Sequence, residues 1–293
     1  MAATGTEELQ QASALRVRKL SPSFGAEVRG IDLSRPVAKE TIRAIRQLWY
    51  EHSVLLVPGQ VLDEDAQVRF GEYFGELAKT MGSYAILKNS HPAVMYVTNE
   101  KAEGKYVGAL PDGEMFFHSD MCYVERPCLG TMLYAMEIPS QGGNTLFADQ
   151  YAAYEALPEE TKRRIDGLKS VHTFEPGRYD NYAESITRAP VSKEARSAAH
   201  PMVLTHPATG RRALYVNRLM TEYIVGMPRE ESNALLASLF DHQEQKQFVY
   251  EHRWTRGDVV IWDNRCVLHA RTDFSAAELR KLRRVTVATD SID

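Results

Sequence analysis

Short runs of apolar or alternating residues dominate the hydrophobic pattern of this chain and predict a protein built mainly from strands. Predicted strands cover residues 15–20, 26–30, 53–57, 94–97, 128–136, 169–174, 202–206 and 213–216, and strands return near the C-terminus. Apolar residues at helical spacing predict helices at 39–51, 63–74, 149–157, 159–168 and 229–242. Because no βαβ rhythm is visible, we expect a sandwich-like β core decorated by helices.

Three irregular segments interrupt this pattern within what we expect to be a single domain over residues 1–293. Residues 1–12 are small, polar and unpatterned, as is typical of a frayed tail. Residues 78–114 are rich in Gly, Asn, Pro and Lys. A long irregular segment just before a candidate site is typical of a lid or substrate loop, although a surface excursion has the same composition. Residues 175–199 read as a polar insertion.

Composition narrows the class of protein without defining its chemistry. The apolar share of 44% and charged share of 25% are ordinary for a globular protein. A net charge of −4 predicts no general attraction to nucleic acid or anionic membranes. No secretory signal and no apolar run long enough for a membrane span are visible. Three cysteines are too few for a disulfide framework, so we expect a reducing cytoplasm.

The run Phe-Phe-His-Ser-Asp at 116–120 is the strongest candidate for chemistry. Side chains alternate along a strand, so His118 and Asp120 are expected to point the same way. One imidazole and one carboxylate make two thirds of the two-histidine, one-carboxylate face that binds non-haem Fe(II) and leaves coordination positions open. A His-x-Asp pair occurs by chance in many chains, so the hypothesis needs a third ligand.

His269 is the best candidate for that ligand because it ends an apolar run. His200 and His206 also flank predicted strands, but each precedes a proline, which favours an extended turn, and neither has a carboxylate at ligand spacing. We interpret both as structural. The other histidines have no clustered partners and are interpreted as surface or core residues: His52, His91, His172, His242 and His252.

Two arginines follow His269 on a predicted strand. Alternation places Arg280 and Arg284 on one face, and Val285 and Val287 on the other. An ordinary strand would send such charges into water. If both faces are covered, as in a double-sheet core, the two arginines point inward and need anionic partners, and arginine is suited to gripping carboxylates.

These motifs, in this order, resemble the taurine/2,4-dichlorophenoxyacetate dioxygenase (TauD/TfdA) family of Fe(II)- and 2-oxoglutarate-dependent oxygenases. The resemblance covers most of the chain and is closer to the aryloxyacetate branch. It is carried by Phe-His-Ser-Asp at 117–120, Gly-Gly-Asn-Thr-Leu-Phe at 142–147 and Thr-His-Pro-Ala-Thr-Gly-Arg at 205–211. The most specific block runs from Trp254 through Trp-Asp-Asn-Arg-Cys-Val-Leu-His at 262–269 to Arg284.

The resemblance implies a mostly β fold with flanking α, whose core is a double-stranded β-helix (jelly-roll, cupin-like). It implies that His118, Asp120 and His269 bind Fe(II) and act in catalysis. By the same motifs, Thr145 and Arg280 hold the far carboxylate of the cosubstrate 2-oxoglutarate, Trp262 lines its pocket, and Arg284 holds the acidic group of the substrate. O₂ is the oxidant, and succinate and CO₂ are released.

The substrate is less constrained than the chemistry. The resemblance favours hydroxylation of a small organic acid, with aryloxyalkanoates first and cleavage of a C–O, C–S or C–N bond as a further outcome. Taurine or another alkylsulfonate is the alternative substrate. Glu114 is expected on the same strand face as His118 and is a candidate substrate contact, or else an exposed acid.

Two other classes of protein share parts of the pattern. A zinc hydrolase would explain the metal ligands but not Thr145 and Arg280. A binding protein on the same scaffold would have no use for open iron positions. Neither nucleic acid nor membrane is expected as a partner, and a homo-oligomer is expected because relatives in the family commonly form one.

Overall fold

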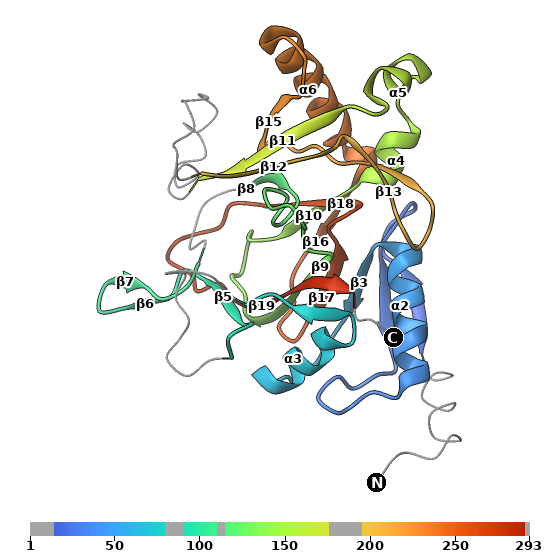
Figure 1. The fold of residues 1–293 in the computed structure, drawn as a ribbon. Coiled ribbons are helices and arrows are strands. Elements are labelled where there is room, and N and C mark those ends of the chain that lie inside the picture. The colour runs from blue at the N-terminus through green and yellow to red at the C-terminus, as the bar shows by residue number, and fades with distance from the viewer. Residues whose placement is uncertain (1–14, 80–90, 110–114, 176–194, 291–293) are drawn as a thin grey trace.

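The computed structural model describes residues 15–79, 91–109, 115–175 and 195–290. The predicted tail at 1–12, Glu114, and parts of the segments at 78–114 and 175–199 lie outside the described residues. The described chain is mostly β with a few helices, as predicted (Figure 1).

The larger sheet has eight strands, paired antiparallel except for the parallel contact of its second and third strands. Its order is β1 (Arg16–Lys19), β2 (Ala26–Arg29), β3 (Val54–Val57), β17 (Val259–Asp263), β9 (Gly130–Glu137), β19 (Lys281–Asp290) and β4 (Gly75–Leu77), and β5 (Met95–Thr98) also pairs with β19. The smaller sheet has the order β16 (Val249–His252), β10 (Thr145–Asp149), β18 (Val267–Arg271) and β8 (Met115–His118).

The two sheets share one apolar core, which is the reason both faces of β19 are covered. Alternate residues of the larger sheet pack in the same cluster as residues of the smaller one. The shared cluster includes Val54, Leu133, Trp262 and Leu282 from the larger sheet and Phe147 and Val267 from the smaller. The predicted sandwich of sheets is therefore present, and polar groups on its inner faces are shielded from water.

Two helices cover the opposite face of the larger sheet (Figure 1). Helix α2 (Lys39–His52) buries Ile42, Ile45 and Trp49 there, and α3 (Glu64–Glu72) begins at the predicted N-cap, Asp63, whose carboxylate accepts from the Ala66 amide. Trp49 packs so close to β9 that a Cβ on Gly130 would lie 2.7 Å from its ring, so only glycine fits at Gly130.

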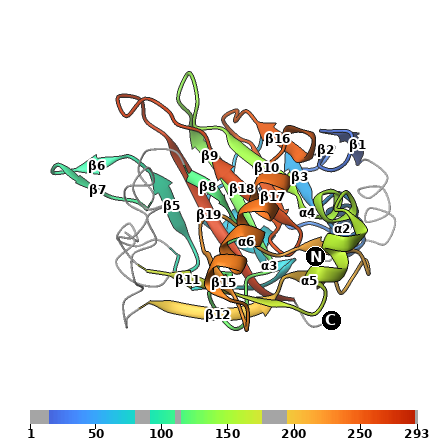
Figure 2. The same cartoon turned by 90° about the horizontal axis from the view of Figure 1, so that it is seen from above.

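A third layer lies beyond the smaller sheet (Figure 2). It contains a three-stranded sheet, the hairpin that the sequence predicted near 202–216, and three helices, which share their own apolar cluster. Its elements are β12 (Arg196–Pro201), β11 (Lys169–Phe174), β15 (Thr221–Ile224), β13 (Val203–Thr205), β14 (Arg212–Leu214), α4 (Gln150–Glu155), α5 (Glu159–Ile165), α6 (Arg229–Gln243) and the 3-10 helix η1 (Lys246–Phe248).

Two irregular segments contain more structure than their composition suggested. The segment at 78–114 has strand β5 as predicted, but also a projecting hairpin of β6 (Lys101–Ala102) and β7 (Lys105–Tyr106). Strand β12 begins inside the predicted insertion because its first residues pair with β11. The hydrophobic pattern did not predict these strands because many of their side chains are polar and face water.

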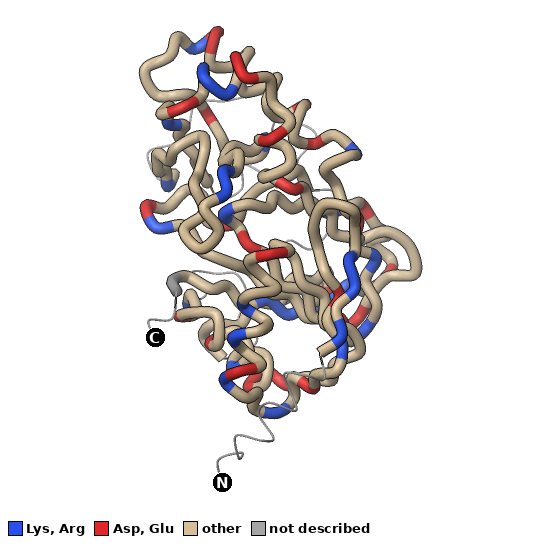
Figure 3. Tube along the Cα trace, turned by 90° about the vertical axis from the view of Figure 1, so that its right-hand side faces the viewer, with Lys and Arg blue, Asp and Glu red and all other residues tan. Residues whose placement is uncertain are grey.

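Charged residues of both signs are interspersed along the trace (Figure 3). Among the described residues, no helix has the length and apolar character needed to cross a membrane.

Candidate active site

Strands β8 and β18 bring together the three residues that the sequence predicted to converge. His118 lies directly opposite His269 in the antiparallel pair, and their rings are 4.1 Å apart between centroids. Asp120 follows in the turn after β8, and its carboxylate oxygens lie 3.8 Å from His118 Nε2 and 3.7 Å from His269 Nε2. In the described part of the chain this is the one group of three potential ligands close enough to share an ion.

The Nε2 atoms of both imidazoles face the Asp120 carboxylate. His118 Nδ1 donates to the Phe116 carbonyl at 2.9 Å, which leaves Nε2 unprotonated when the ring is neutral. His269 Nδ1 has no hydrogen-bond partner in the described part of the chain, although it is buried. Burial lowers the pKa of both histidines, and a neutral imidazole is the form that binds a metal.

Asp120 is held ionised and fixed in place. Burial alone would raise its pKa, but Arg284 and the two imidazoles hold the pKa of the carboxyl well below its usual range. Arg284 Nη2 lies 3.1 Å from Asp120 Oδ1, and Thr131 donates to Oδ2 at 2.6 Å. Two neutral imidazoles and one oriented carboxylate are a donor set that fits a divalent iron.

A side-chain amide braces this arrangement. Asn264 donates to Thr131 Oγ1 at 3.0 Å, and its carbonyl oxygen accepts from Trp262 Nε1 at 2.9 Å and from the Asp120 amide at 3.4 Å. The Trp262 ring packs against His269, with centroids 4.6 Å apart. Trp262, predicted to line a cosubstrate pocket, thus also fixes the orientation of a candidate metal ligand.

Two arginines lie on the C-terminal side of His269: Arg271 and Arg280, which contact the same Phe274 ring. Arg280 is 3% exposed, and its Nε donates to the Gly143 carbonyl at 3.0 Å. No carboxylate of the described residues lies within ion-pair distance of its guanidinium. Burial and the nearby charge of Arg271 lower the pKa of Arg280 to about 9, so a bound carboxylate would stabilise the charged form.

Thr145 and Arg271 lie on the neighbouring strands β10 and β18. They are direct cross-strand partners, so their side chains share the inner face of the smaller sheet. Trp254 Nε1 donates to Thr145 Oγ1 at 3.0 Å. Arg271 and Arg280 both lie against the ring of Phe274, at 5.6 and 5.8 Å from its centroid.

Sequence reasoning missed several residues of the site. Arg271 could have been found, because it stands two residues after His269 and therefore shares its face. Thr131, Asn264 and Trp254 are polar or aromatic residues in apolar strands or turns, and only their side-chain hydrogen bonds assign them to the site. Glu114, the predicted substrate contact, lies outside the described residues.

The remaining histidines are held by protein groups. His200 Nε2 hydrogen-bonds the Val124 carbonyl at 2.9 Å, as expected of a structural residue. His206 and His252 are buried beside the carboxylates of Asp263 and Asp258, at 3.0 and 3.2 Å, which agrees with a structural or core role. Residues distant in sequence supply these partners, so local spacing could not reveal them.

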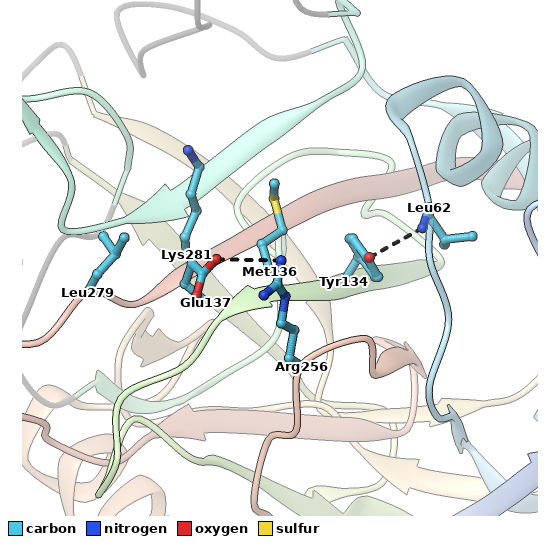
Figure 4. Close-up of a pocket in the computed structure, with 7 residues that line it drawn as sticks. All are labelled: Leu62, Tyr134, Met136, Glu137, Arg256, Leu279 and Lys281. Carbon is cyan, nitrogen blue, oxygen red and sulfur yellow. Dashed lines mark hydrogen bonds and ion pairs between the residues drawn. The ribbon is translucent and has the colours of Figure 1, made fainter.

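The hollow shown in Figure 4 is not part of this site. It is lined by Tyr134 and Lys281, among others, which alternate along their strands with residues that face the shared core. It therefore opens on the opposite face of the larger sheet. An ion pair of Glu137 with Arg256, 3.8 Å apart, crosses it.

Fold and site together define a double-sheet protein with a two-histidine, one-carboxylate group beside buried arginines. Residues 16–286 match the family described as "Taurine catabolism dioxygenase TauD, TfdA family". The alpha-ketoglutarate-dependent 2,4-dichlorophenoxyacetate dioxygenase of Cupriavidus pinatubonensis is 34% identical, over 93% of this chain and 97% of that protein. The chain belongs to the TauD/TfdA family, as the sequence motifs predicted.

Solved structures agree with this assignment. The crystal structure of a taurine dioxygenase from Burkholderia xenovorans superposes with a TM-score of 0.79 at 29% identity, covering 94% of this chain and 90% of that one. A structure of AAD-2 in complex with Mn(II) and N-oxalylglycine superposes with a TM-score of 0.77 at 29% identity, covering 94% and 98% of the two chains.

Proposed function

We propose that this protein is an Fe(II)- and 2-oxoglutarate-dependent dioxygenase that hydroxylates a small organic acid. One observation carries the proposal: three buried metal-binding groups are linked through Arg271 to Arg280, a buried cation without a carboxylate partner in the described part of the chain. A metal site alone would serve a hydrolase equally well. The buried charge of Arg280 calls for an anionic second ligand, and 2-oxoglutarate has the required carboxylate at its far end.

Each candidate residue has a distinct role in this proposal. His118, Asp120 and His269 hold Fe(II) on one face and leave other positions open. When bound, iron with 2-oxoglutarate and O₂ supplies the oxidising power for hydroxylation, with release of succinate and CO₂. Thr145 and Arg280 hold the far carboxylate of 2-oxoglutarate.

The protein contributes position, charge and exclusion of water. Arg284, beside Asp120, holds the acidic group of the substrate near the metal and keeps Asp120 ionised. Trp262 lines the cosubstrate pocket and supports His269. Because these groups are buried between two sheets, their orientation is set before the substrate arrives.

The substrate class follows from the relatives. A 2,4-dichlorophenoxyacetate dioxygenase is among the similar curated proteins, so an aryloxyalkanoate is the first candidate, with ether cleavage as a consequence of hydroxylation beside oxygen. The likeness to a taurine dioxygenase supports an alkylsulfonate as the second. Arg284 suits either acidic group.

The remaining features belong to the same proposal. The core is a double-stranded β-helix of the jelly-roll type within one domain. The predicted active-site lid within residues 78–114, the predicted substrate contact Glu114 and the predicted insertion within residues 175–199 remain part of it. The protein acts in the cytoplasm as a homo-oligomer, with a small organic acid as its partner and neither nucleic acid nor membrane.

The test is a screen for succinate release with Fe(II), 2-oxoglutarate and a panel of aryloxyalkanoates, other carboxylates and alkylsulfonates. We expect succinate with at least one acid and none with Asp120→Ala, which serves as the blank. Turnover with zinc alone, or none across the panel with iron-loaded protein, would contradict the proposal.

A further inference from the structure

The hydrogen bond between Trp254 and Thr145 determines what Thr145 can offer a ligand. Trp254 Nε1 donates to Thr145 Oγ1 at 3.0 Å, and both side chains are buried. An indole N–H can only donate, so this bond always occupies a lone pair of the hydroxyl. The hydroxyl proton is left to point elsewhere, and Thr145 makes no other side-chain hydrogen bond in the described part of the chain.

The surroundings of that proton are cationic. Arg271 is the direct cross-strand partner of Thr145 on the inner face, and Arg280 reaches the same end of β10 at the Gly143 carbonyl. Guanidinium groups cannot accept a hydrogen bond. None of the described residues accepts a hydrogen bond from this buried hydroxyl, and a bound carboxylate would satisfy both the proton and the positive charge.

Packing against other side chains fixes the orientation of the Trp254 indole. Its ring meets His252 edge to face, with centroids 4.6 Å apart and an interplanar angle of 85°, and it packs in the core shared by the two sheets. His252 is the other cross-strand partner of Thr145. The donor is therefore fixed relative to the strand that carries Thr145.

We propose that Trp254 is a positioning residue for the cosubstrate: its indole N–H occupies one lone pair of the Thr145 hydroxyl, and so orients the hydroxyl to donate its proton to a carboxylate of the ligand. The inference rests on the proposed function, because it takes the ligand to be 2-oxoglutarate. It adds a residue that does not touch the ligand, and it disfavours a neutral amide at that end, because an amide N–H₂ would face guanidinium donors and a single remaining lone pair of Thr145.

The test measures binding rather than turnover. N-oxalylglycine is titrated calorimetrically into Mn(II)-loaded protein for the wild type and Trp254→Phe, which keeps a ring but loses the N–H. We expect about tenfold weaker binding of N-oxalylglycine by the variant, as for loss of one hydrogen bond. The Mn(II) affinity should be unchanged, because Trp254 contacts no candidate ligand.

Matched variants separate this role from general packing. Trp49 is also buried, but its Nε1 has no hydrogen-bond partner in the described part of the chain, so Trp49→Phe controls for loss of an indole and should leave N-oxalylglycine binding unchanged. Thr145→Val should weaken binding, Thr145→Ser should restore it, and adding Trp254→Phe to Thr145→Val should have no further effect.

The outcomes distinguish the inference from the function on which it rests. Wild-type binding of N-oxalylglycine by Trp254→Phe, or an equal loss in the Thr145→Val background, overturns the positioning role and leaves the dioxygenase proposal intact. Failure of the Mn(II)-loaded wild type to bind N-oxalylglycine overturns both.

Discussion

The Arg284 guanidinium and the Asp120 carboxylate form an ion pair, with Nη2 and Oδ1 3.1 Å apart, at a largely buried position. The residue proposed to hold the substrate acid thus already contacts a proposed metal ligand. A bound metal would share the carboxylate with Arg284, and a substrate acid would share the guanidinium with Asp120. Substrate binding and the electrostatics of the metal are therefore linked through this one contact.

Arg284→Gln should impair the substrate far more than the cosubstrate. Removing one partner of a buried charge pair typically costs at least about 2 kcal/mol, so KM for the substrate should rise by about thirtyfold or more. Steady-state succinate kinetics measure this change, with the exposed Arg35→Gln as control. An equal loss of affinity for 2-oxoglutarate would instead place Arg284 in the cosubstrate pocket.

Thr131→Val should weaken metal binding, although it leaves all three candidate metal ligands in the sequence unchanged. The substitution keeps the shape of the side chain but removes the 2.6 Å hydrogen bond to Asp120 Oδ2. Loss of such an outer contact typically lowers metal affinity by about 10–100-fold. Titration with Mn(II) measures it. Thr41→Val is the matched control, because the buried Thr41 hydroxyl has no hydrogen-bond partner in the described part of the chain.

Arg280→Ala should nearly abolish cosubstrate binding while the metal still binds. The guanidinium is buried, and its loss leaves a carboxylate without a counter-charge, at a cost of about 3 kcal/mol or more. Anaerobic titration of metal-loaded protein with 2-oxoglutarate should show an affinity at least about a hundredfold lower. Unchanged affinity would mean that the carboxylate lies elsewhere.

Arg271→Gln should have a smaller and more selective effect. Its charge acts on both regions, since it contributes to lowering the pKa of His118 and of Arg280. We expect about tenfold weaker binding of 2-oxoglutarate, as for loss of one charged contact. Binding of 2-oxobutyrate, which lacks the far carboxylate, should be nearly unchanged. Equal losses for both acids would assign Arg271 a structural role.

The sequence predicted the features that depend on local periodicity or on motifs. Alternation placed Arg280 and Arg284 on one face, and in the structure Arg280 is buried while the Arg284 side chain is 13% exposed and reaches Asp120. Alternation did not predict the burial of Arg283 on the opposite face of the strand. Its guanidinium donates hydrogen bonds to the Gln67 side chain and to backbone carbonyls. That outcome depends on α3 packing against β19.

Side-chain contacts between residues far apart in the chain could not be predicted from the sequence. The hydrogen bond from Trp254 to Thr145 joins residues far apart in the chain, and neither residue type signals it. The same is true of the pair of His206 and Asp263. Side chains of this kind are identified by the register of strands in the folded sheet, and register follows from the packing of the whole core.

His172 should make the stability of the metal-free protein depend on pH. It is fully buried between the hydroxyls of Ser170 and Thr221, at 3.2 and 3.1 Å, and burial, followed by His200, lowers its pKa to about 3. Below about pH 6.5 the unfolded chain binds a proton here that the folded protein does not bind until about pH 3. The contribution of His172 to the free energy of unfolding is therefore fully present above about pH 6.5. It declines as the pH falls, by up to about 1.4 kcal/mol per pH unit.

Urea unfolding at pH 7, 6 and 5 should show that this dependence on pH is weaker in His172→Gln than in the wild type. Thr221→Val, which removes a hydrogen-bond partner but no titrating group, should lower stability and keep the wild-type slope; an unchanged slope in His172→Gln would show that other groups are responsible.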